Sequence, residues 1–278
     1  MNRIRWFLRD IAEYCFSIQT AFVLIVQYII MDYYGREITS FSLEAGCKVT
    51  PWILPFLNAN LVYSIISGIT IVYFFSTVPF LQYKEMYVVL RQGRSNWLMS
   101  KIVRIIISSA FLTIMIALCS MLICAKNLSF SLDWGDVYNT IALTNAGSEY
   151  NITLEIPYQI VAEYEPIEAM FMNCVSMFLE MVIIGMVMFT LALCLSKTVS
   201  VAFGTFACLI ALALENMRMT NTYMRIFAID QWAYLVNFED VFGTNGMLTL
   251  LFVTLLLVIV CTVIMLIRIR KIDFNFAI

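Results

Sequence analysis

Long stretches without charge alternate with short charged clusters along the chain, and this pattern predicts membrane-spanning helices. A helix rises about 1.5 Å per residue, so about 20 apolar residues cross a hydrocarbon layer about 30 Å thick. The uncharged stretches near or above this length are Tyr14–Met31, Val49–Tyr83, Ile105–Ala125, Thr198–Leu214 and Val241–Ile267, and a sixth, Ala169–Ser196, is interrupted only by Glu180. The second stretch is too long for one straight crossing, so we expect a bend near Pro51 and Pro55. The chain, 1–278, is therefore expected to be a single all-α membrane domain with six transmembrane helices.

The segment before the first span, residues 1–14, has the pattern of a helix that lies in the membrane interface. Ile4, Phe7 and Ile11 recur at helical spacing, while charged residues cover the other side. Trp6 is placed to anchor such a helix at the level of the lipid headgroups. An ordinary positively charged flank to the first span is the alternative.

Two further segments are expected on the outer side of the membrane. Residues 126–166 form the larger one, in which Ile152, Leu154 and Ile156 alternate with polar residues in the manner of a strand. We expect a small extracytoplasmic subdomain there, with some β-structure. Residues 216–246 carry aromatic side chains among mixed charges, which is typical of outer helices at headgroup level before a last span.

Composition and charge support lipid as the solvent and give the orientation. Hydrophobic residues make up 62% of the chain, charged residues only 13%, and the mean hydropathy is +0.87. Lys and Arg concentrate on the cytoplasmic side of membrane proteins. Of the 17 basic residues, 12 fall on the face that also carries both termini: Arg3, Arg5, Arg9, Lys84, Arg91, Arg94, Lys101, Arg104, Lys197, Arg268, Arg270 and Lys271. We therefore expect a multi-pass protein of a plasma membrane with both termini in the cytoplasm. A bacterial source is a separate expectation, which the charge distribution does not decide.

Acidic residues gather instead in the outer segment. They are Asp133, Asp136, Glu149, Glu155, Glu163 and Glu165. This surface could attract a cationic substrate or bind a cation, and a solvated surface without a ligand is the plainer interpretation. Cys47 lies in an outer loop while the other seven Cys lie within spans or at their edges, so no disulfide framework is expected. A Cys47–Cys124 bridge is geometrically possible.

The absence of one residue type and of two sequence motifs excludes several kinds of enzyme. The chain has no His, which removes His-based proton shuttles, catalytic triads and the common zinc and haem sites. No Gly-x4-Gly-Lys-Ser/Thr phosphate loop and no Gly-x-Ser-x-Gly elbow occurs. We expect no catalytic residue and no metal or cofactor bound by this chain.

One acid, Glu180, lies deep inside a predicted span. A charge at that depth costs several kcal/mol unless it is paired, hydrated or protonated. Asn173 and Ser176 precede it by seven and four residues, so the three share a helical face, and the second span offers a similar stripe with Asn60 and Ser64. Hydrogen bonding between helices is the favoured interpretation, and a substrate path or gate is the alternative.

The most informative stretch is the basic connection between the second and third spans. Residues 83–94 predict a short helix on the cytoplasmic surface, and Gly93 suits the position that ends it. Ser95 is then expected to cap the next helix. Trp97 and Lys101 are expected to anchor that helix at headgroup depth. A partner docking on the short helix is favoured over a plain positively charged loop.

At these residues the chain resembles the permease subunit of type-2 (type V) ATP-binding-cassette exporters. The resemblance covers most of the length and is carried by the spacing Glu-x5-Arg-x-Gly-Arg-x2-Trp-x3-Lys, here Glu85, Arg91, Gly93, Arg94, Trp97 and Lys101. The short turn at Lys197 between the fourth and fifth spans also fits. The large outer segment departs from the plainest members of the family.

This resemblance implies a passive gate driven by other chains. Two permease chains, identical or related, would associate with two cassette ATPase subunits that bind the ATP and Mg, and no nucleic acid would be involved. Glu85, Tyr87, Leu90, Arg91, Gly93, Arg94 and Lys197 would form the ATPase-coupling surface. The implied cargo is a peptide or an amphipathic, lipid-like molecule.

Two other classes of protein stay open at this point. A non-enzymatic membrane sensor or assembly protein would bind a ligand at the outer loop and drive nothing. A secondary carrier would need a membrane-embedded ion site, for which Glu180 is the single candidate, and no inverted repeat is evident.

Overall fold

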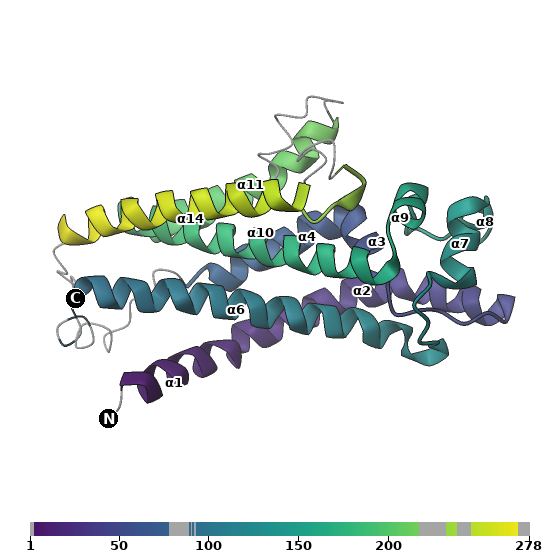
Figure 1. Cartoon of the computed structure of the whole chain (residues 1–278), viewed down its shortest axis with the longest axis horizontal. Helices are drawn as coiled ribbons and strands as arrows, with labels where there is room; N and C mark the ends of the chain where they lie inside the picture. Colours follow the sequence, from purple (N-terminus) through teal and green to yellow (C-terminus); the bar gives the residue numbers. More distant parts are fainter. Residues whose placement is uncertain are drawn as a thin grey trace.

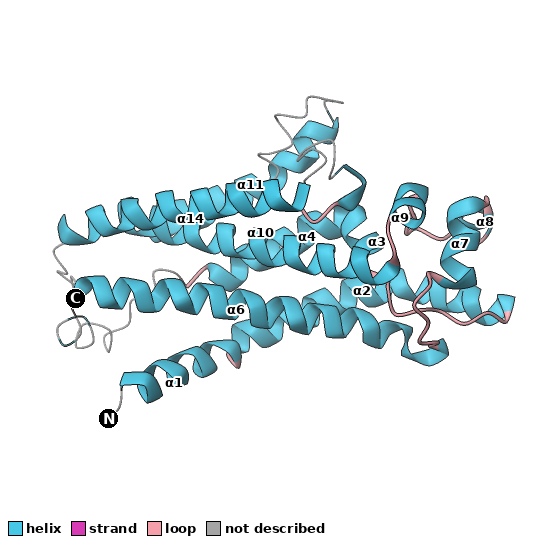
Figure 2. Ribbon diagram, in the orientation of Figure 1, coloured by secondary structure: helices cyan, strands magenta, loops and turns pink. Residues whose placement is uncertain are grey.

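The computed structural model describes residues 3–77, 89, 91, 93–216, 232–237 and 246–271, and this part of the chain is a bundle of helices (Figures 1 and 2). The only β-pairing among these residues is an isolated bridge between Val49 and Leu128. The elements are α1 Arg3–Cys15, α2 Ile18–Ala45, α3 Leu54–Ala59, α4 Leu61–Phe75, α6 Arg94–Ile123, η1 Cys124–Asn127, α7 Gly135–Leu143, α8 Ala146–Glu149, α9 Tyr158–Glu163, α10 Pro166–Cys194, α11 Lys197–Asn216, η3 Leu235–Asn237 and α14 Gly246–Lys271.

Four helical stretches are long and apolar enough to cross a membrane. They are Arg9–Ala45, Arg94–Asn127, Pro166–Cys194 and Gly246–Arg270. Two further apolar helices, Leu61–Phe75 and Lys197–Ile210, are shorter. The all-helical, membrane-like character that the sequence predicts is therefore confirmed, with four of the six expected spans reaching full length.

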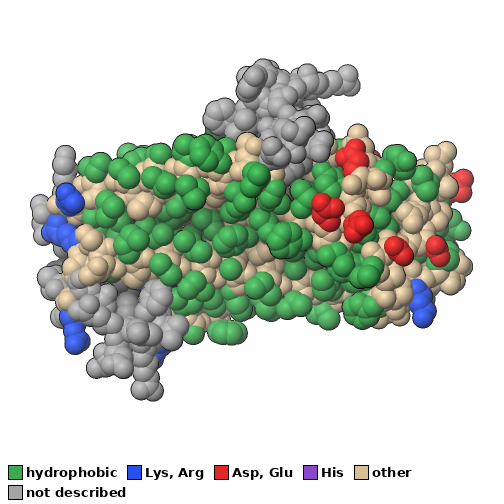
Figure 3. Space-filling model, viewed as in Figure 1, with side chains coloured by type: hydrophobic (Ala, Val, Ile, Leu, Met, Phe, Trp, Pro, Cys, Tyr) green, Lys and Arg blue, Asp and Glu red, His purple; other side chains and the backbone are tan. Residues whose placement is uncertain are grey.

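Helix α10 lies at the centre of the bundle. In its most apolar window 72% of the residues are buried, against 22% in α14, and α10 contacts α4, α6, α11 and α14. The peripheral helices instead expose apolar side chains such as Phe22 and Phe252, and Figure 3 shows hydrophobic side chains over the middle of the molecule. An outer surface of this kind suits lipid contact, since a soluble monomer rarely exposes a continuous apolar band.

The second predicted span is broken, as expected, but the break lies at Asn60. Pro55 sits in the first turn of α3, where proline is tolerated, and α3 ends at Ala59. Asn60 then caps α4, because its Oδ1 accepts the Tyr63 backbone N–H at 3.1 Å. The same oxygen accepts the Tyr34 hydroxyl at 3.3 Å, which ties the joint to α2.

Helix α2 continues well beyond Met31, where the uncharged stretch ends. Asp32 and Arg36 form an ion pair one turn apart, at 2.5 Å, and the helix stops at Ala45, followed by Gly46 with φ of 67°. Charge therefore marks where the apolar stretch ends and not where the helix ends. Its 28 residues span about 42 Å, so its last third projects past a hydrocarbon layer of about 30 Å.

The outer segment 126–166 packs on this projecting end, and the predicted β-structure there is wrong. The alternation was informative about burial, since Leu154 and Ile156 are buried and Thr153 and Glu155 are exposed. However, the stretch has no partner strand among the described residues and runs as irregular chain between α8 and α9. Glu37 of α2 holds it by accepting the Thr153 backbone N–H at 2.6 Å and hydroxyl at 2.8 Å.

Gly185 of α10 permits the close approach of α6 and α4, and this gives a stability prediction. A Cβ at position 185 would lie 2.7 Å from Ile105 Cγ2 and 3.2 Å from the Phe75 ring. Overpacking of this kind costs about 1–3 kcal/mol, which outweighs the gain in helix propensity of up to about 1 kcal/mol from Ala. We expect Gly185→Ala to lower the thermal unfolding midpoint in detergent. Gly147→Ala, whose Cβ would meet Ile141 at 3.4 Å, should not lower it, and equal midpoints for the two variants would contradict this packing.

Candidate functional site

Polar side chains of α10 face the interior of the bundle, in agreement with the prediction that they share one face of the helix. Asn173 and Ser176 are fully buried, and Glu180 is 4% exposed. Asn173 Oδ1 accepts Asn58 Nδ2 of α3 at 2.7 Å, while its own Nδ2 donates to the Ala233 carbonyl at 2.8 Å. A single amide thus joins α3, α10 and the 232–237 segment.

A second row of polar side chains lines α4. Ser64, Ser67 and Thr70 are buried there. Gln27 of α2 reaches this row, and its Nε2 donates to Ser67 Oγ at 3.0 Å and to Thr70 Oγ1 at 2.7 Å. Of the two residues predicted for a path in this span, Ser64 is therefore inside the bundle, while Asn60 is half-buried and serves as the cap of α4.

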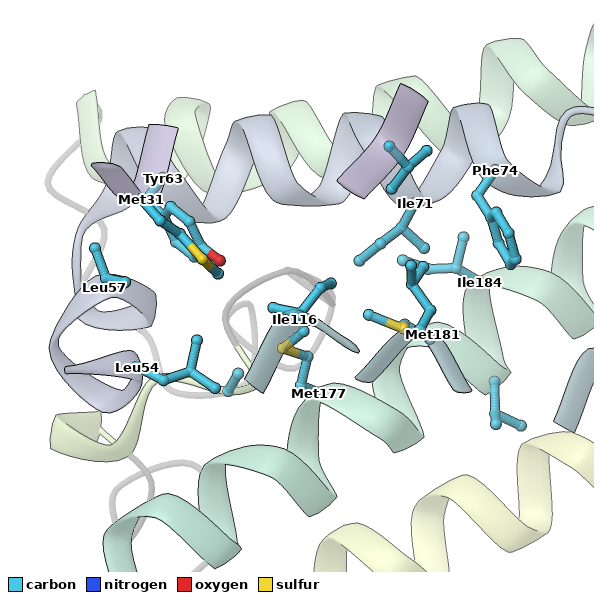
Figure 4. Packing of buried hydrophobic residues seen from close by; sticks show 14 of the residues in the cluster. Met31, Leu54, Leu57, Tyr63, Ile71, Phe74, Ile116, Met177, Met181 and Ile184 are labelled. Atoms are coloured by element: carbon cyan, nitrogen blue, oxygen red, sulfur yellow. The ribbon is translucent and has the colours of Figure 1, made fainter. Parts of the chain in front are cut away.

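Tyr63 connects the two rows. Figure 4 shows it pointing from α4 into the interior, with Met177 and Met181 of α10 across the core. The Tyr63 side chain is fully buried, and Glu180 lies close enough to act on its hydroxyl electrostatically. Together the rows form a polar track from Gln27 through Tyr63 to Glu180, enclosed by buried Met and Ile side chains.

One end of the bundle is basic, and it carries the start of α6 and the end of α14. Some of the residues predicted for the ATPase-coupling surface lie at this end. Glu85, Tyr87 and Leu90 lie outside the described residues, as does the side chain of Trp6 on α1. Arg91 and Lys197 are exposed. Basic side chains at this end appear in blue in Figure 3.

Gly93 begins α6 with a backbone conformation, φ 84° and ψ 153°, that is essentially restricted to glycine. Its N–H donates to the Val89 carbonyl at 2.9 Å, in agreement with the expectation that it ends the preceding turn. The expected cap at Ser95 is wrong, because α6 begins at Arg94, with Gly93 as its N-cap, two residues earlier than a cap at Ser95 requires.

Two arginines tie the helix ends together on this side. Arg94 Nη1 donates to the Ile269 and Arg270 carbonyls of α14, at 3.4 and 3.1 Å. Arg268 Nη2 donates to the Cys194 carbonyl at the end of α10, at 3.3 Å. Cations near helix C-termini also interact favourably with the helix dipole. The start of α6 is thereby connected to the ends of α14 and α10.

The prediction that Trp97 and Lys101 anchor α6 at headgroup depth is wrong. Both side chains are fully buried, and Trp97 packs against Phe189 of α10 with ring centroids 6.2 Å apart. Lys101 Nζ lies 3.3 Å from Asp10 Oδ2. A helix that packs between α1 and α10 has no lipid-facing side at these two positions, so the residues stabilise the bundle and do not contact headgroups.

Asp10 of α1 is the centre of a buried charge cluster that the sequence analysis did not identify. Arg104 Nη1 contacts its two carboxylate oxygens at 3.1 and 3.0 Å, in addition to the Lys101 contact. The Arg104 guanidinium also lies 4.3 Å above the Tyr14 ring, and the Tyr14 hydroxyl donates to the Phe74 carbonyl of α4 at 2.6 Å. Helices α1, α6 and α4 therefore meet at one electrostatic joint.

The opposite end carries an acidic hollow of about 950 Å³. Asp133, Asp136, Glu163 and Glu165 line it together with Lys48, and acidic side chains gather at this end in Figure 3. Its wall is held by backbone-directed bonds: Thr50 Oγ1 donates to the Trp134 carbonyl at 2.9 Å, and Trp134 Nε1 donates to the Tyr164 carbonyl at 2.9 Å. The predicted acidic surface is thus a concave one.

Neither Cys47 nor Cys124 is bridged, so the possible disulfide is not formed. Cys124 is buried with its Sγ 3.9 Å from the Tyr138 hydroxyl, while Cys47 is half-buried and its Sγ lies 3.7 Å from the Ala45 carbonyl. Burial raises the pKa of Tyr138 well above its ordinary value, so this hydroxyl stays neutral and donates to the Thr50 carbonyl at 3.2 Å.

Comparison with protein-family models, curated proteins and solved structures finds no match to this chain.

The contacts of Asp10 lead us to expect that Asp10→Asn, which replaces one carboxylate oxygen with an amide nitrogen, strongly lowers the free energy of unfolding. Asp10→Asn leaves Lys101 and Arg104 without the carboxylate that pairs them, and breaking a buried ion pair costs about 3–5 kcal/mol. We expect the free energy of unfolding to fall by about 3 kcal/mol, since the Asp10 side chain is 18% exposed. Thermal or denaturant unfolding in detergent measures it.

The matched control lies one turn away on the same helix. Glu13 pairs with Arg9 at 2.7 Å, but both side chains are mostly exposed. Glu13→Gln should cost about 0.5 kcal/mol or less. A similar small loss in both variants would show that the Asp10 cluster does not hold α1 on the bundle.

Proposed function

We propose that this chain is the permease subunit of an ATP-binding-cassette exporter, in which separate ATPase subunits supply the energy. The observation that carries the proposal is the linkage at the basic end. Segment 83–94 ends with Gly93 and with Arg94, the first residue of α6, and Arg94 donates to the Ile269 and Arg270 carbonyls near the end of α14. A displacement applied to this segment is passed to α6 and α14 together.

The same displacement reaches the rest of the bundle through two further contacts. Arg268 links α14 to the end of central α10, and Lys101 and Arg104 link α6 to α1 through Asp10. In this proposal a rigid-body movement driven by ATPase closure changes how α6 and α14 pack on α10. The exposed Arg91 and Lys197 contribute the charge that meets the partner.

The proposed assembly contains two ATPase subunits, which bind ATP and Mg, and a second permease chain, identical or related. Six spans, two of them shorter than the others, place both termini in the cytoplasm of a bacterial cell. The basic end, with Arg91, Arg94, Lys197, Arg268 and Arg270, then faces inward, in accordance with the positive-inside rule.

The proposed cargo is a peptide or an amphipathic, lipid-like molecule. Two features support this class: a polar track that includes Asn173, Ser176 and Glu180 inside an otherwise apolar bundle, and an acidic hollow at the outer end. Exposed apolar faces on α2, α11 and α14 suit a cargo that reaches the protein from the bilayer.

The acidic hollow also favours a second candidate function, that of a membrane sensor or assembly protein without transport. Its volume of about 950 Å³ is within the range of small-molecule sites, and its four carboxylates suit a cationic ligand. Such a protein would need the hollow and would not depend on the backbone at Gly93.

Gly93 and Gly46 form a matched pair that tests the proposal. Both have positive φ, of 84° and 67°, and open space where a Cβ would stand, so Ala at either position strains only the backbone. Gly93 begins α6 at the proposed ATPase face, whereas Gly46 ends α2 at the outer end. We expect Gly93→Ala to keep the ATPase bound while reducing transport per ATP hydrolysed at least tenfold, and Gly46→Ala to leave that ratio unchanged.

The measurement uses the affinity-tagged chain purified from its native membrane in mild detergent. Co-purifying proteins are identified, vanadate-sensitive ATP hydrolysis is measured in the eluate, and the complex is reconstituted for transport. A chain that never brings down a cassette ATPase, even on co-expression, defeats the proposal. The sensor is supported instead by a different result: the variant that lacks residues 128–165 loses its activity in the cell, while Gly93→Ala keeps it in full.

A further inference from the structure

Three buried polar atoms along the polar track have no hydrogen-bond partner in the part of the chain that the structure describes. They are the Tyr63 hydroxyl, Ser176 Oγ and Gln27 Oε1. All three residues are fully buried. Leaving one such group unpaired costs about 1–3 kcal/mol, so three in one bundle require an explanation.

The three atoms belong to one region of the core. Ser176 and Glu180 are one turn apart on the inner face of α10. Tyr63 projects from α4 toward α10, where Glu180 acts on its hydroxyl electrostatically, and Ser67, one turn further along α4, is its polar neighbour on the same helix. Gln27 Nε2 is bonded to that same Ser67, so the track is continuous from α2 to α10.

We propose that ordered water binds between α4 and α10 at Tyr63, Ser176 and Glu180. A buried water molecule makes about three hydrogen bonds and needs two to four polar partners, which two hydroxyls and a carboxylate supply. Water both accepts from a hydroxyl and donates to a carboxylate. A metal cation has no lone pair to offer a hydroxyl proton, and no group of three His, Cys, Asp or Glu with metal-site geometry occurs among the described residues.

This site gives Glu180 a water contact in the interior of a lipid-facing bundle. The carboxylate is then stabilised by hydration in addition to its protein contacts, which lowers the cost of an acid at this depth. At this site the polar side chains of α4 and those of α10 are joined through an exchangeable water molecule instead of through direct side-chain hydrogen bonds. The inference does not depend on the proposed transport function.

The direction of a stability change tests the proposal. If water satisfies the two hydroxyls, Tyr63→Phe and Ser176→Ala each remove a hydrogen bond, and we expect each to lower the unfolding midpoint by about 2–4 °C. The double variant should lose less than the sum, since both hydroxyls bind the same water cluster. In a dry core the same changes remove an unsatisfied group, so an unchanged or higher midpoint for either single variant overturns the proposal.

Two control variants show how much the unfolding midpoint falls when a hydroxyl with a known partner is removed. The Tyr34 hydroxyl donates to Asn60 and the Ser109 hydroxyl to the Ile105 carbonyl at 2.8 Å, so Tyr34→Phe and Ser109→Ala report the loss of a hydroxyl that has a protein partner. Replacing sodium with choline in the buffer should leave the wild-type midpoint unchanged. A sodium-dependent midpoint that disappears in Glu180→Gln would assign a cation to the site and overturn the proposal.

A direct readout is hydroxyl-radical labelling by X-ray radiolysis, which modifies buried side chains that lie against bound water. Wild-type protein should show labelling of Tyr63 and Met177, although both are shielded from bulk solvent. Tyr138 is equally buried but donates to a backbone carbonyl, so it should stay unlabelled. Labelling of Tyr138 at the same rate as Tyr63, or of neither, contradicts a water site at Tyr63.

Discussion

The central position of α10 imposes the constraint on which the rest of the bundle depends. A helix surrounded by other helices cannot expose its polar side chains to bulk water, so neighbouring segments or bound water must supply their hydrogen-bond partners. Asn173 obtains its partners from α3 and from the Ala233 carbonyl. The second predicted span is broken at Asn60, and in this arrangement Asn58 of α3 donates to Asn173 of α10.

The two ends of the bundle are stabilised by different physical means. At the basic end, Arg94 and Arg268 donate to carbonyls at the C-termini of α14 and α10, and Asp10 neutralises charges on α6. At the outer end, aromatic rings and neutral hydrogen bonds dominate, such as those of Trp134 to the Tyr164 carbonyl and of Thr50 to Trp134. Contacts between charges weaken in high salt and neutral ones do not, so ionic strength acts on the Asp10 contacts more than on these neutral hydrogen bonds.

The sequence predicted the features that depend on composition and local periodicity. The apolar helices, the inward face of Asn173, Ser176 and Glu180, the break in the second span and the special role of Gly93 all follow from residue type and spacing. The alternation at Leu154 and Ile156 predicted a strand that the structure does not contain, although both side chains are buried, because alternation reports which side is covered and not whether a second strand is present.

Features that depend on the packing of distant helices were not predictable from the sequence. Trp97 and Lys101 have the composition of an interfacial anchor, and only the position of α1 and α10 shows that they are interior. The sequence places Asp10 only on the charged side of the expected interfacial helix 1–14, and its partners Lys101 and Arg104 lie about 90 residues away in the chain. Gln27 is a single amide in an apolar stretch, and this pattern indicates a polar contact between α2 and another helix.

The joint at Asn60 has a consequence for the thickness of the surrounding bilayer. Helix α4 has 15 residues and covers about 22 Å, so it cannot match a hydrocarbon layer of about 30 Å by itself. The missing depth is provided by α3, whose Leu54, Phe56 and Leu57 are shielded from lipid. A single rigid helix in a bilayer responds to longer or shorter acyl chains by tilting, whereas a broken span has a second variable, the angle between its two halves. In a membrane, hydrophobic mismatch would then act on the protein at one amide side chain, that of Asn60.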